Sequence, residues 1–120
     1  MRIDSTESYL DETARVHHDG ELFDGEVETR DATGTVIDLT TYWQGIPHGP
    51  HSAWYPSGRI RQQGVHNAGT AVGEWRKWHP NGRLAELRTF DPQGRQLTRR
   101  RWDSDGNLVE EKTTGTTQSL

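Results

Sequence analysis

A short motif recurs along this chain at intervals of 24 residues, and it limits the chain to repeat architectures. Each copy closes on a glycine, and an aliphatic residue stands two positions later. A tryptophan precedes three of the four glycines by four positions, whereas Arg30 takes this place in the first copy. A fixed period of this kind indicates stacked supersecondary units. The repeat glycines are Gly34, Gly58, Gly82 and Gly106, and the aliphatic residues are Val36, Ile60, Leu84 and Leu108.

Two turn signals in each unit leave room for two strands and no helix. One turn reads Tyr55-Pro56-Ser57-Gly58 in one copy and His79-Pro80-Asn81-Gly82 in the next, with Pro fixing the first corner and Gly accepting positive φ. Other turns are expected at residues 44–45, 68–69 and 91–94. Connections this short join antiparallel strands, because parallel strands need a longer crossover. The sequence therefore predicts an all-β fold, an elongated single-layer antiparallel meander of stacked 24-residue β-hairpin repeats.

The repeat domain is expected over residues 13–112, with an N-terminal arm at 1–12 and a disordered tail at 113–120. In the arm, Ser5 or Thr6 could cap a short helix that runs to Glu12, and a frayed arm is the alternative. Residues 13–24 look like the second half of a unit, with a turn at residues 18–21. The tail is polar and lies beyond the last repeat.

Composition narrows the class of protein further. Only 29% of the residues are hydrophobic, so a thick two-layer core is not expected, but five Trp, three Tyr and two Phe could stack along one line. The absence of cysteine excludes disulfides and thiolate chemistry. No signal-peptide core and no run of about 18 apolar residues is visible, so the default expectation is a soluble cytoplasmic protein.

The large aromatic residues of the repeat are the candidate core. Shifting the chain by one period superimposes three tryptophans, and residues of equal parity share a face of a strand. We expect Trp78 at the centre of an aromatic ladder that is structural rather than a binding surface. The proposed ladder consists of Trp54, Trp78, Trp102, Tyr55 and Phe90.

These motifs resemble a known repeat. The stretches GEWRKWHPNGRL and GPHSAWYPSGRI fit the pattern G-x-W-x-x-W/Y-x-x-N/S-G-x-L/I, which resembles the variant MORN repeat of the bacterial YwqK-like antitoxin or immunity family. The resemblance extends over residues 13–112 and is weakest in the first unit, where Arg30 and Thr33 replace the aromatic residue and Asn. It implies a twisted sheet of hairpins and an immunity protein that neutralises a co-encoded toxin, with no cofactor.

Charge is distributed unevenly along the chain. Residues 1–40 hold 11 acidic residues and three Arg, whereas residues 41–120 hold 7 acidic residues and 11 Arg and Lys. An acidic end attracts a basic protein such as a toxin that acts on nucleic acid. The alternative is that the charge serves only solubility. We predict a partner contact in the N-terminal half, formed by Glu26, Glu28, Asp31, Tyr42 and Trp43, and open sheet edges could also pair copies into a homo-oligomer.

Other functions are less well supported by the sequence. The six histidines include His48 and His51 across a turn, with His17 and His18 before them, but this spacing is not that of an established metal site, and we assign no metal ion. An enzyme or small-molecule-binding protein that uses the His-rich and aromatic surface stays open as an alternative, as does a structural scaffold; Ser52 beside His51 needs geometry to be judged.

Nucleic acid binding is the last alternative. Residues 99–101 are three consecutive arginines before Trp102, a composition that suits phosphate contact and base stacking. The arginines alternate between the two faces of a strand, and the sequence pI is about 5.8, so nucleic acid and membranes are not expected partners. We assign no catalytic residue.

Overall fold

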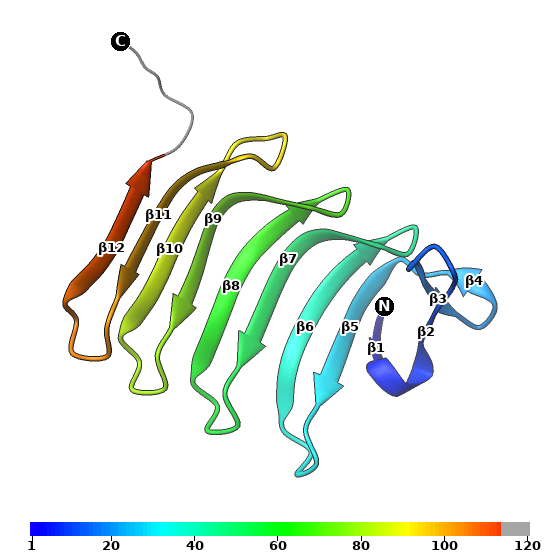
Figure 1. Cartoon of the computed structure of the whole chain (residues 1–120). Coiled ribbons are helices and arrows are strands. Elements are labelled where there is room, and N and C mark those ends of the chain that lie inside the picture. Colours follow the sequence, from blue (N-terminus) through cyan, green and yellow to red (C-terminus); the bar gives the residue numbers. More distant parts are fainter. Residues whose placement is uncertain (114–120) are drawn as a thin grey trace.

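The computed structural model describes residues 1–113, and it is a single broad sheet of nine strands with a small sheet at one end (Figure 1). The strands of the main sheet follow the order β1-β5-β6-β7-β8-β9-β10-β11-β12, and the small sheet has the order β2-β3-β4. The main sheet is an open antiparallel meander from β5 to β12, which confirms the predicted fold class. Of the tail expected at 113–120, only Thr113 lies within the described residues, as the last residue of β12.

The elements are short, and those of the main sheet grow longer toward its centre. The small elements are β1 (Arg2–Asp4), the 3-10 helix η1 (Ser5–Glu7), β2 (Tyr9–Leu10), β3 (Val16–His18) and β4 (Glu21–Leu22). The meander consists of β5 (Gly25–Arg30), β6 (Val36–Trp43), β7 (Ile46–Trp54), β8 (Ile60–Asn67), β9 (Thr70–Trp78), β10 (Leu84–Phe90), β11 (Gln96–Trp102) and β12 (Leu108–Thr113).

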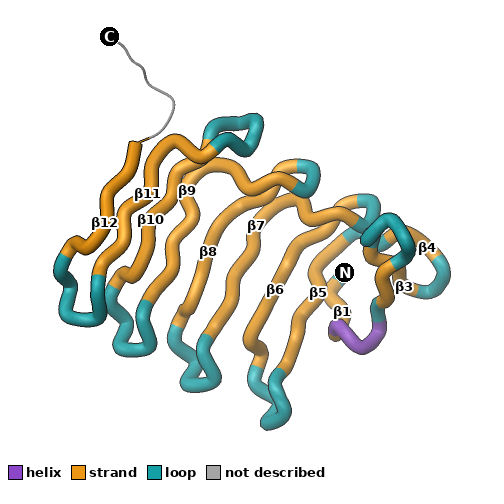
Figure 2. The backbone as a smooth tube through the Cα atoms, in the orientation of Figure 1, coloured by secondary structure: helices purple, strands orange, loops and turns teal. Residues whose placement is uncertain are grey.

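Two kinds of turn join these strands along the two margins of the sheet (Figure 2). In the five-residue turns, the first N–H donates to the fifth carbonyl and the fourth N–H donates back to the first carbonyl, over 2.8–3.0 Å. The repeat glycines occupy the fourth position with φ of 89–93°, a conformation that disfavours a side chain. These turns span residues 11–15, 31–35, 55–59, 79–83, 91–95 and 103–107.

The two-residue turns have positive φ at both positions, as a tight hairpin with the twist of its strands requires. They lie at Asp19-Gly20, Gln44-Gly45 and Ala68-Gly69. All three sites carry the turn signals that the sequence analysis identified, so the hairpin register follows from short-range chemistry.

The N-terminal segment departs from the expected arm. Asp4, rather than Ser5 or Thr6, caps the helix, which ends after one turn at Glu7. Arg2–Asp4 forms β1, which pairs in parallel with β5. The parallel pairing is feasible because about 20 residues separate the two strands, enough for a crossover.

The small sheet supplies the one compact core of the described chain. Val16 and Phe23 pack with Ile3 and Val27, and Tyr42 covers this cluster from the main sheet. Two backbone bonds at Gly45 attach the small sheet to the meander, one from Val16 N–H and one to the Phe23 carbonyl. Residues 13–22 therefore belong to a separate small sheet, where a continuation of the repeat sheet was expected.

Strand pairing assigns the residues of the meander to two faces. Residues in register share a face, and neighbours along a strand alternate. We call the face that carries Asp38, His51, Trp75 and Glu86 the network face. The opposite face carries the pairs Trp54–Ile60, Trp78–Leu84 and Trp102–Leu108, and we call it the stripe face.

Trp75 is the one buried tryptophan among residues 1–113, and its ring covers Gly64 on the neighbouring strand. A Cβ at Gly64 would collide with the ring atoms Cδ2, Cε2 and Cε3. The indole Nε1 donates to the carbonyl of Val65 over 3.2 Å, which satisfies its one polar group. The missing side chain at Gly64 thus makes the space that lets a tryptophan lie flat on a one-layer sheet.

This packing predicts that Gly64→Ala destabilises the fold by about 1–3 kcal/mol, the usual cost of overpacking. Gly64 does not adopt positive φ, so the loss is steric rather than a backbone effect. Trp75→Ala should cost about 3–5 kcal/mol. In the Trp75→Ala background, adding Gly64→Ala should change the free energy of unfolding by less than about 0.5 kcal/mol. Urea unfolding of the four proteins measures this coupling, and strictly additive effects would contradict the contact.

Candidate functional site

The centre of the network face holds two histidines, a carboxylate and Trp75. Asp38 Oδ2 lies 2.9 Å from His51 Nε2, and Thr40 Oγ1 donates to Asp38 Oδ1 over 2.7 Å. The His51 and His66 rings have centroids 5.7 Å apart, and both rings contact Trp75, at 5.6 and 4.9 Å. Adjacent strands β6 to β9 supply these residues, so the cluster follows from register alone.

Burial and hydrogen bonding act in opposite directions on this cluster. Burial raises the pKa of Asp38, but the hydrogen bonds from His51 and Thr40 outweigh it, so the pKa lies below its ordinary value. Burial lowers the pKa of His66, and the neighbouring His51 lowers it further. His66 is therefore held neutral, with its buried Nδ1 lacking a hydrogen-bond partner.

The Asp38–His51 pair lacks the other groups that hydrolytic catalysis needs. Ser52 precedes Ala53 on β7 and points to the stripe face, away from the His51 ring. The neighbouring hydroxyl of Thr40 is already donated to Asp38. The hollow beside His51, lined also by Ser52, Gly64 and Arg76, is open to solvent.

The remaining histidines take part in separate local contacts. His48 Nδ1 accepts from the Ala68 N–H over 3.0 Å, and His79 Nε2 lies 2.8 Å from the Trp102 carbonyl. His17 binds Asp11 over 2.8 Å, in the small sheet. Across the part of the chain that the structure describes, no three His, Asp or Glu side chains converge to hold a metal ion.

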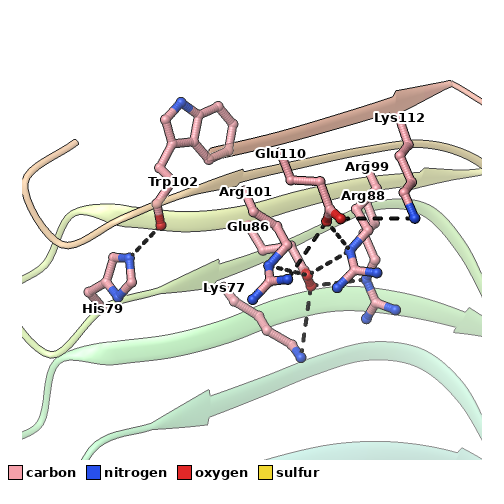
Figure 3. A network of polar contacts seen from close by, with 9 residues as sticks. All are labelled: Lys77, His79, Glu86, Arg88, Arg99, Arg101, Trp102, Glu110 and Lys112. Atoms are coloured by element: carbon pink, nitrogen blue, oxygen red, sulfur yellow. Dashed lines mark hydrogen bonds and ion pairs between the residues drawn. The ribbon is translucent and has the colours of Figure 1, made fainter. Parts of the chain in front are cut away.

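The network face over β9–β12 carries a connected set of ion pairs centred on Glu86 (Figure 3). Glu86 is 8% exposed and lies 3.2 Å from the Nε atoms of Arg88 and Arg99. Lys77 and Arg101 approach Glu86 at 3.8 and 3.9 Å. Glu110 on β12 connects to Arg99, Arg101 and Lys112 over 3.4–3.9 Å.

The acidic residues predicted to contact a partner are largely occupied within the chain. Glu28 is held by Arg2 at 3.0 Å and by Arg30 at 2.6 Å. Asp31 accepts hydrogen bonds from Thr33 and from the Thr35 N–H inside its own turn, which lowers its pKa. Glu26 lies beside Glu28 on the stripe face and is paired with Arg2 in register.

The two predicted aromatic anchors lie apart from each other. Tyr42 points to the network face and packs against the small core. Trp43 lies at the end of β6, is 56% exposed and contacts the His48 ring at 6.0 Å. The five predicted residues are thus distributed over both faces and both margins, and the structure does not unite them in one surface.

The three tryptophans of the predicted ladder and three aliphatic residues form one mixed stripe along the margin of the stripe face, whereas Tyr55 and Phe90 lie outside it. Each tryptophan is paired across a strand with an aliphatic residue, so aromatic and aliphatic residues alternate on successive strands. All of them except Leu108 are half-buried. Tyr55 lies in a turn and donates its hydroxyl to the Trp78 carbonyl over 2.5 Å, and Phe90 lies on the network face beneath Arg88.

An acidic hollow of about 290 Å³ lies beside the small sheet. Asp19, Glu21 and Asp24 contribute carboxylates to it, and Leu22 and Phe23 contribute apolar surface. All three acidic residues are exposed. Asp24 accepts from the Gln44 N–H over 2.6 Å, and Asp19 lies 3.3 Å from Nε2 of His18, which also lines the hollow.

Sequence reasoning missed the centre of the network face. Trp75, Gly64 and Glu86 were not among the candidate residues. The 24-residue spacing contains a signal for them, because Val27, His51, Trp75 and Arg99 stand one period apart. The glycine that opens space for Trp75 belongs to a neighbouring column, so the pair becomes visible only when the strand register is known.

Comparisons with known proteins support the repeat and leave its role unassigned. The family model described as MORN repeat variant matches residues 71–91, which supports a MORN-repeat protein. Among curated proteins, none matches this chain.

Solved structures with a similar shape are distant. A mutant of TarM from S. aureus has a TM-score of 0.43 at 8% identity, with 89% of this chain and 19% of that chain covered. Accessory secretory protein 1, 2 and 3 from Streptococcus pneumoniae gives 0.38 at 11% identity, covering 85% and 18%. The GtfA/B complex gives 0.37 at 8% identity, covering 69% and 21%. The chain spans about a fifth of the length of these structures. The described residues contain no helix of the length and hydropathy that a membrane crossing requires.

The neutral state of His66 predicts a pH dependence. Because the folded pKa of His66 lies below its unfolded value of about 6.5, the unfolded chain binds the proton more readily, and stability falls as the pH drops through this value. His66→Phe should flatten the decrease in unfolding free energy between about pH 7 and pH 5. Urea unfolding of both proteins at pH 7 and pH 5 measures this decrease, and the difference between the two proteins at pH 8 measures the effect of the substitution on packing alone. An equal decrease in both proteins would contradict a neutral His66 in the folded state.

The ion-pair network predicts that Glu86→Gln destabilises the fold by about 1–3 kcal/mol, because four cations lose their shared, shielded anion. Added salt should recover part of the loss by screening the repulsion among these cations. Glu111→Gln on the stripe face removes the partner of Arg100 at the surface and should change stability by less than about 0.5 kcal/mol. Equal melting temperatures for Glu86→Gln and the unsubstituted protein would contradict a stabilising role for Glu86.

Proposed function

We propose that this chain is a protein-binding repeat module, and that its partner is a co-encoded toxin with a basic surface, which it neutralises. The match to a MORN repeat supports a repeat module. The role in immunity is the finer part of the proposal. It depends on the family resemblance of the sequence motifs together with the acidity of the N-terminal end.

The acidic hollow is the observation that supports a basic partner most directly. Exposed carboxylates at Asp19 and Glu21 surround apolar surface from Leu22, so a lysine or arginine of the partner would find both charge and contact area. Exposed Trp43 lies at the nearby margin of the sheet, beyond the Gln44-Gly45 turn to which the small sheet is bonded. Aromatic side chains of this kind commonly anchor protein interfaces.

The test starts from the neighbouring open reading frame. Its product is purified in an inactive form and its association with this chain is measured by stopped-flow fluorescence at several salt concentrations. Failure of the neighbouring protein to bind, together with failure to reduce its toxicity in cells, would contradict the immunity proposal.

Reversing the charge of the hollow should slow association. Asp19→Lys with Glu21→Lys should lower the association rate about tenfold at low salt and weaken its salt dependence. Both substitutions leave Glu28 and Asp31 unchanged, because the carboxylate of Glu28 forms ion pairs and that of Asp31 accepts hydrogen bonds within the chain. Glu74→Lys with Glu111→Lys makes the same change in net charge on the C-terminal half and is the matched control. An equal effect of both pairs would show that total charge, rather than the hollow, governs the encounter.

A further inference from the structure

The C-terminal half of the network face carries more positive charge than it neutralises. Over β9–β12, five cationic side chains surround two carboxylates, Glu86 and Glu110, so the patch has a net charge of about +3. The cations are Lys77, Arg88, Arg99, Arg101 and Lys112. Together with Glu86 and Glu110 they form a set of seven residues that we call the cationic patch. The patch lies on a protein whose overall charge is -4, so its sign is a local property of one face.

The opposite face of the same strands is balanced. Arg76 pairs with Glu74 at 2.9 Å, and Arg100 pairs with Glu111 at 2.7 Å, one cation for each carboxylate. The excess is therefore confined to the network face. A need for solubility alone does not explain why the excess positive charge lies on one face of the sheet only.

The arginines of the patch are oriented before any ligand arrives. Arg99 donates a hydrogen bond through Nε to Glu86, and Arg88 and Arg101 also approach this carboxylate most closely through Nε, as ion pairs at 3.2 and 3.9 Å (Figure 3). The Nη1 atom of Arg101 lies 3.7 Å from Glu110. The side chains of Lys77 and Arg101 are half exposed, and that of Lys112 is 63% exposed. A guanidinium fixed at one edge can bind an incoming carboxylate with less loss of side-chain entropy.

The surrounding residues favour an acidic polypeptide over nucleic acid. Bound single strands stack their bases on accessible aromatic rings. Trp75 is buried, and the Phe90 ring is covered by the Arg88 guanidinium at 5.3 Å, so neither ring beside the patch is free for stacking. In an extended peptide, side chains on one face recur about every 6.6–6.8 Å, a spacing that allows several carboxylates to reach neighbouring strands of the patch.

We propose that the cationic patch on β9–β12 binds a carboxylate-rich segment of a partner polypeptide. This surface differs in sign and in position from the acidic hollow, so its test is independent of the test of the immunity proposal. The segment lies across the strands of the network face, with its acidic side chains on the terminal nitrogens of Arg88, Arg99 and Arg101.

The experiment uses a fluorescein-labelled hexaglutamate peptide and the full chain, with binding followed by fluorescence anisotropy at low and physiological salt. We expect saturable binding that weakens with salt. Arg99→Gln with Arg101→Gln should weaken it about tenfold or more. Arg76→Gln with Arg100→Gln removes the same charge from the stripe face and should change it less than about twofold. Circular dichroism confirms that both variants keep the fold.

A second pair of variants tests whether added positive charge strengthens peptide binding, and it leaves every arginine in place. Glu110→Gln raises the charge of the patch and should tighten peptide binding about two- to fivefold, whereas Glu111→Gln, one residue away on the other face, should not. Absence of peptide binding, or equal loss from both arginine pairs, would overturn the proposal. If a 12-nucleotide DNA binds more tightly than the peptide through the same arginines, the ligand of the patch is nucleic acid instead. If the chain self-associates and Arg99→Gln with Arg101→Gln abolishes this, the ligand is a second copy of the chain.

Discussion

Most of this sheet is one layer thick, so side chains from β7 to β12 can be buried only by their neighbours within the sheet. A side chain on a single layer keeps one side in water unless an adjacent residue yields space or a long side chain covers it. On the strands β7 to β12 the buried apolar residues are Ala53 and Trp75, and Trp75 is buried because Gly64 leaves space for its ring. The rest of the buried apolar surface lies at the N-terminal end, where the small sheet adds a second layer.

Where apolar burial is scarce, polar contacts repeated at the period of the sequence connect the hairpins. Tyr55 binds the carbonyl of Trp78, and His79, one period later, binds the carbonyl of Trp102. Arg83 Nη1 likewise donates to the Asp105 carbonyl over 2.7 Å. Each contact joins two successive units, and the first two contacts recur one period apart. The stability of the sheet is therefore a sum over neighbouring units, as expected for a repeat protein. Asp31 and Asp103 stabilise their own turns in a similar way. The Thr33 hydroxyl and the Thr35 N–H lower the pKa of Asp31, and the Asn107 N–H lowers the pKa of Asp103.

The sequence predicted the parts of the fold that depend on short-range chemistry. Turn residues with positive φ identify the hairpins, and the period identifies which strands are equivalent. The parallel strand β1 could not be predicted in this way, because its pairing with β5 depends on a contact between segments about 20 residues apart. The bulges also could not be predicted from the sequence. An extra residue on β8 lies opposite Ala53 and Trp54, so the alternation of residues between the two faces shifts there, and the face of a residue on β8 cannot be deduced from the alternation on β7.

The same limit explains why the predicted partner residues do not form one surface. Glu28 and Asp31 are acidic in sequence, but in the fold Arg2 and Arg30 pair with Glu28, and Thr33 binds Asp31, contacts that no sequence pattern indicates. Conversely, the arginines at 99 and 101 were weighed only as nucleic acid contacts, because the carboxylate that they share, Glu86, lies 13 and 15 residues earlier in the chain. Charge read along a chain reports composition, whereas binding depends on which charges remain after the neighbouring strands have paired. On this sheet the unpaired excess is negative at the small sheet and positive on the network face over β9–β12, so a partner that contacts both ends must itself carry separate regions of opposite charge.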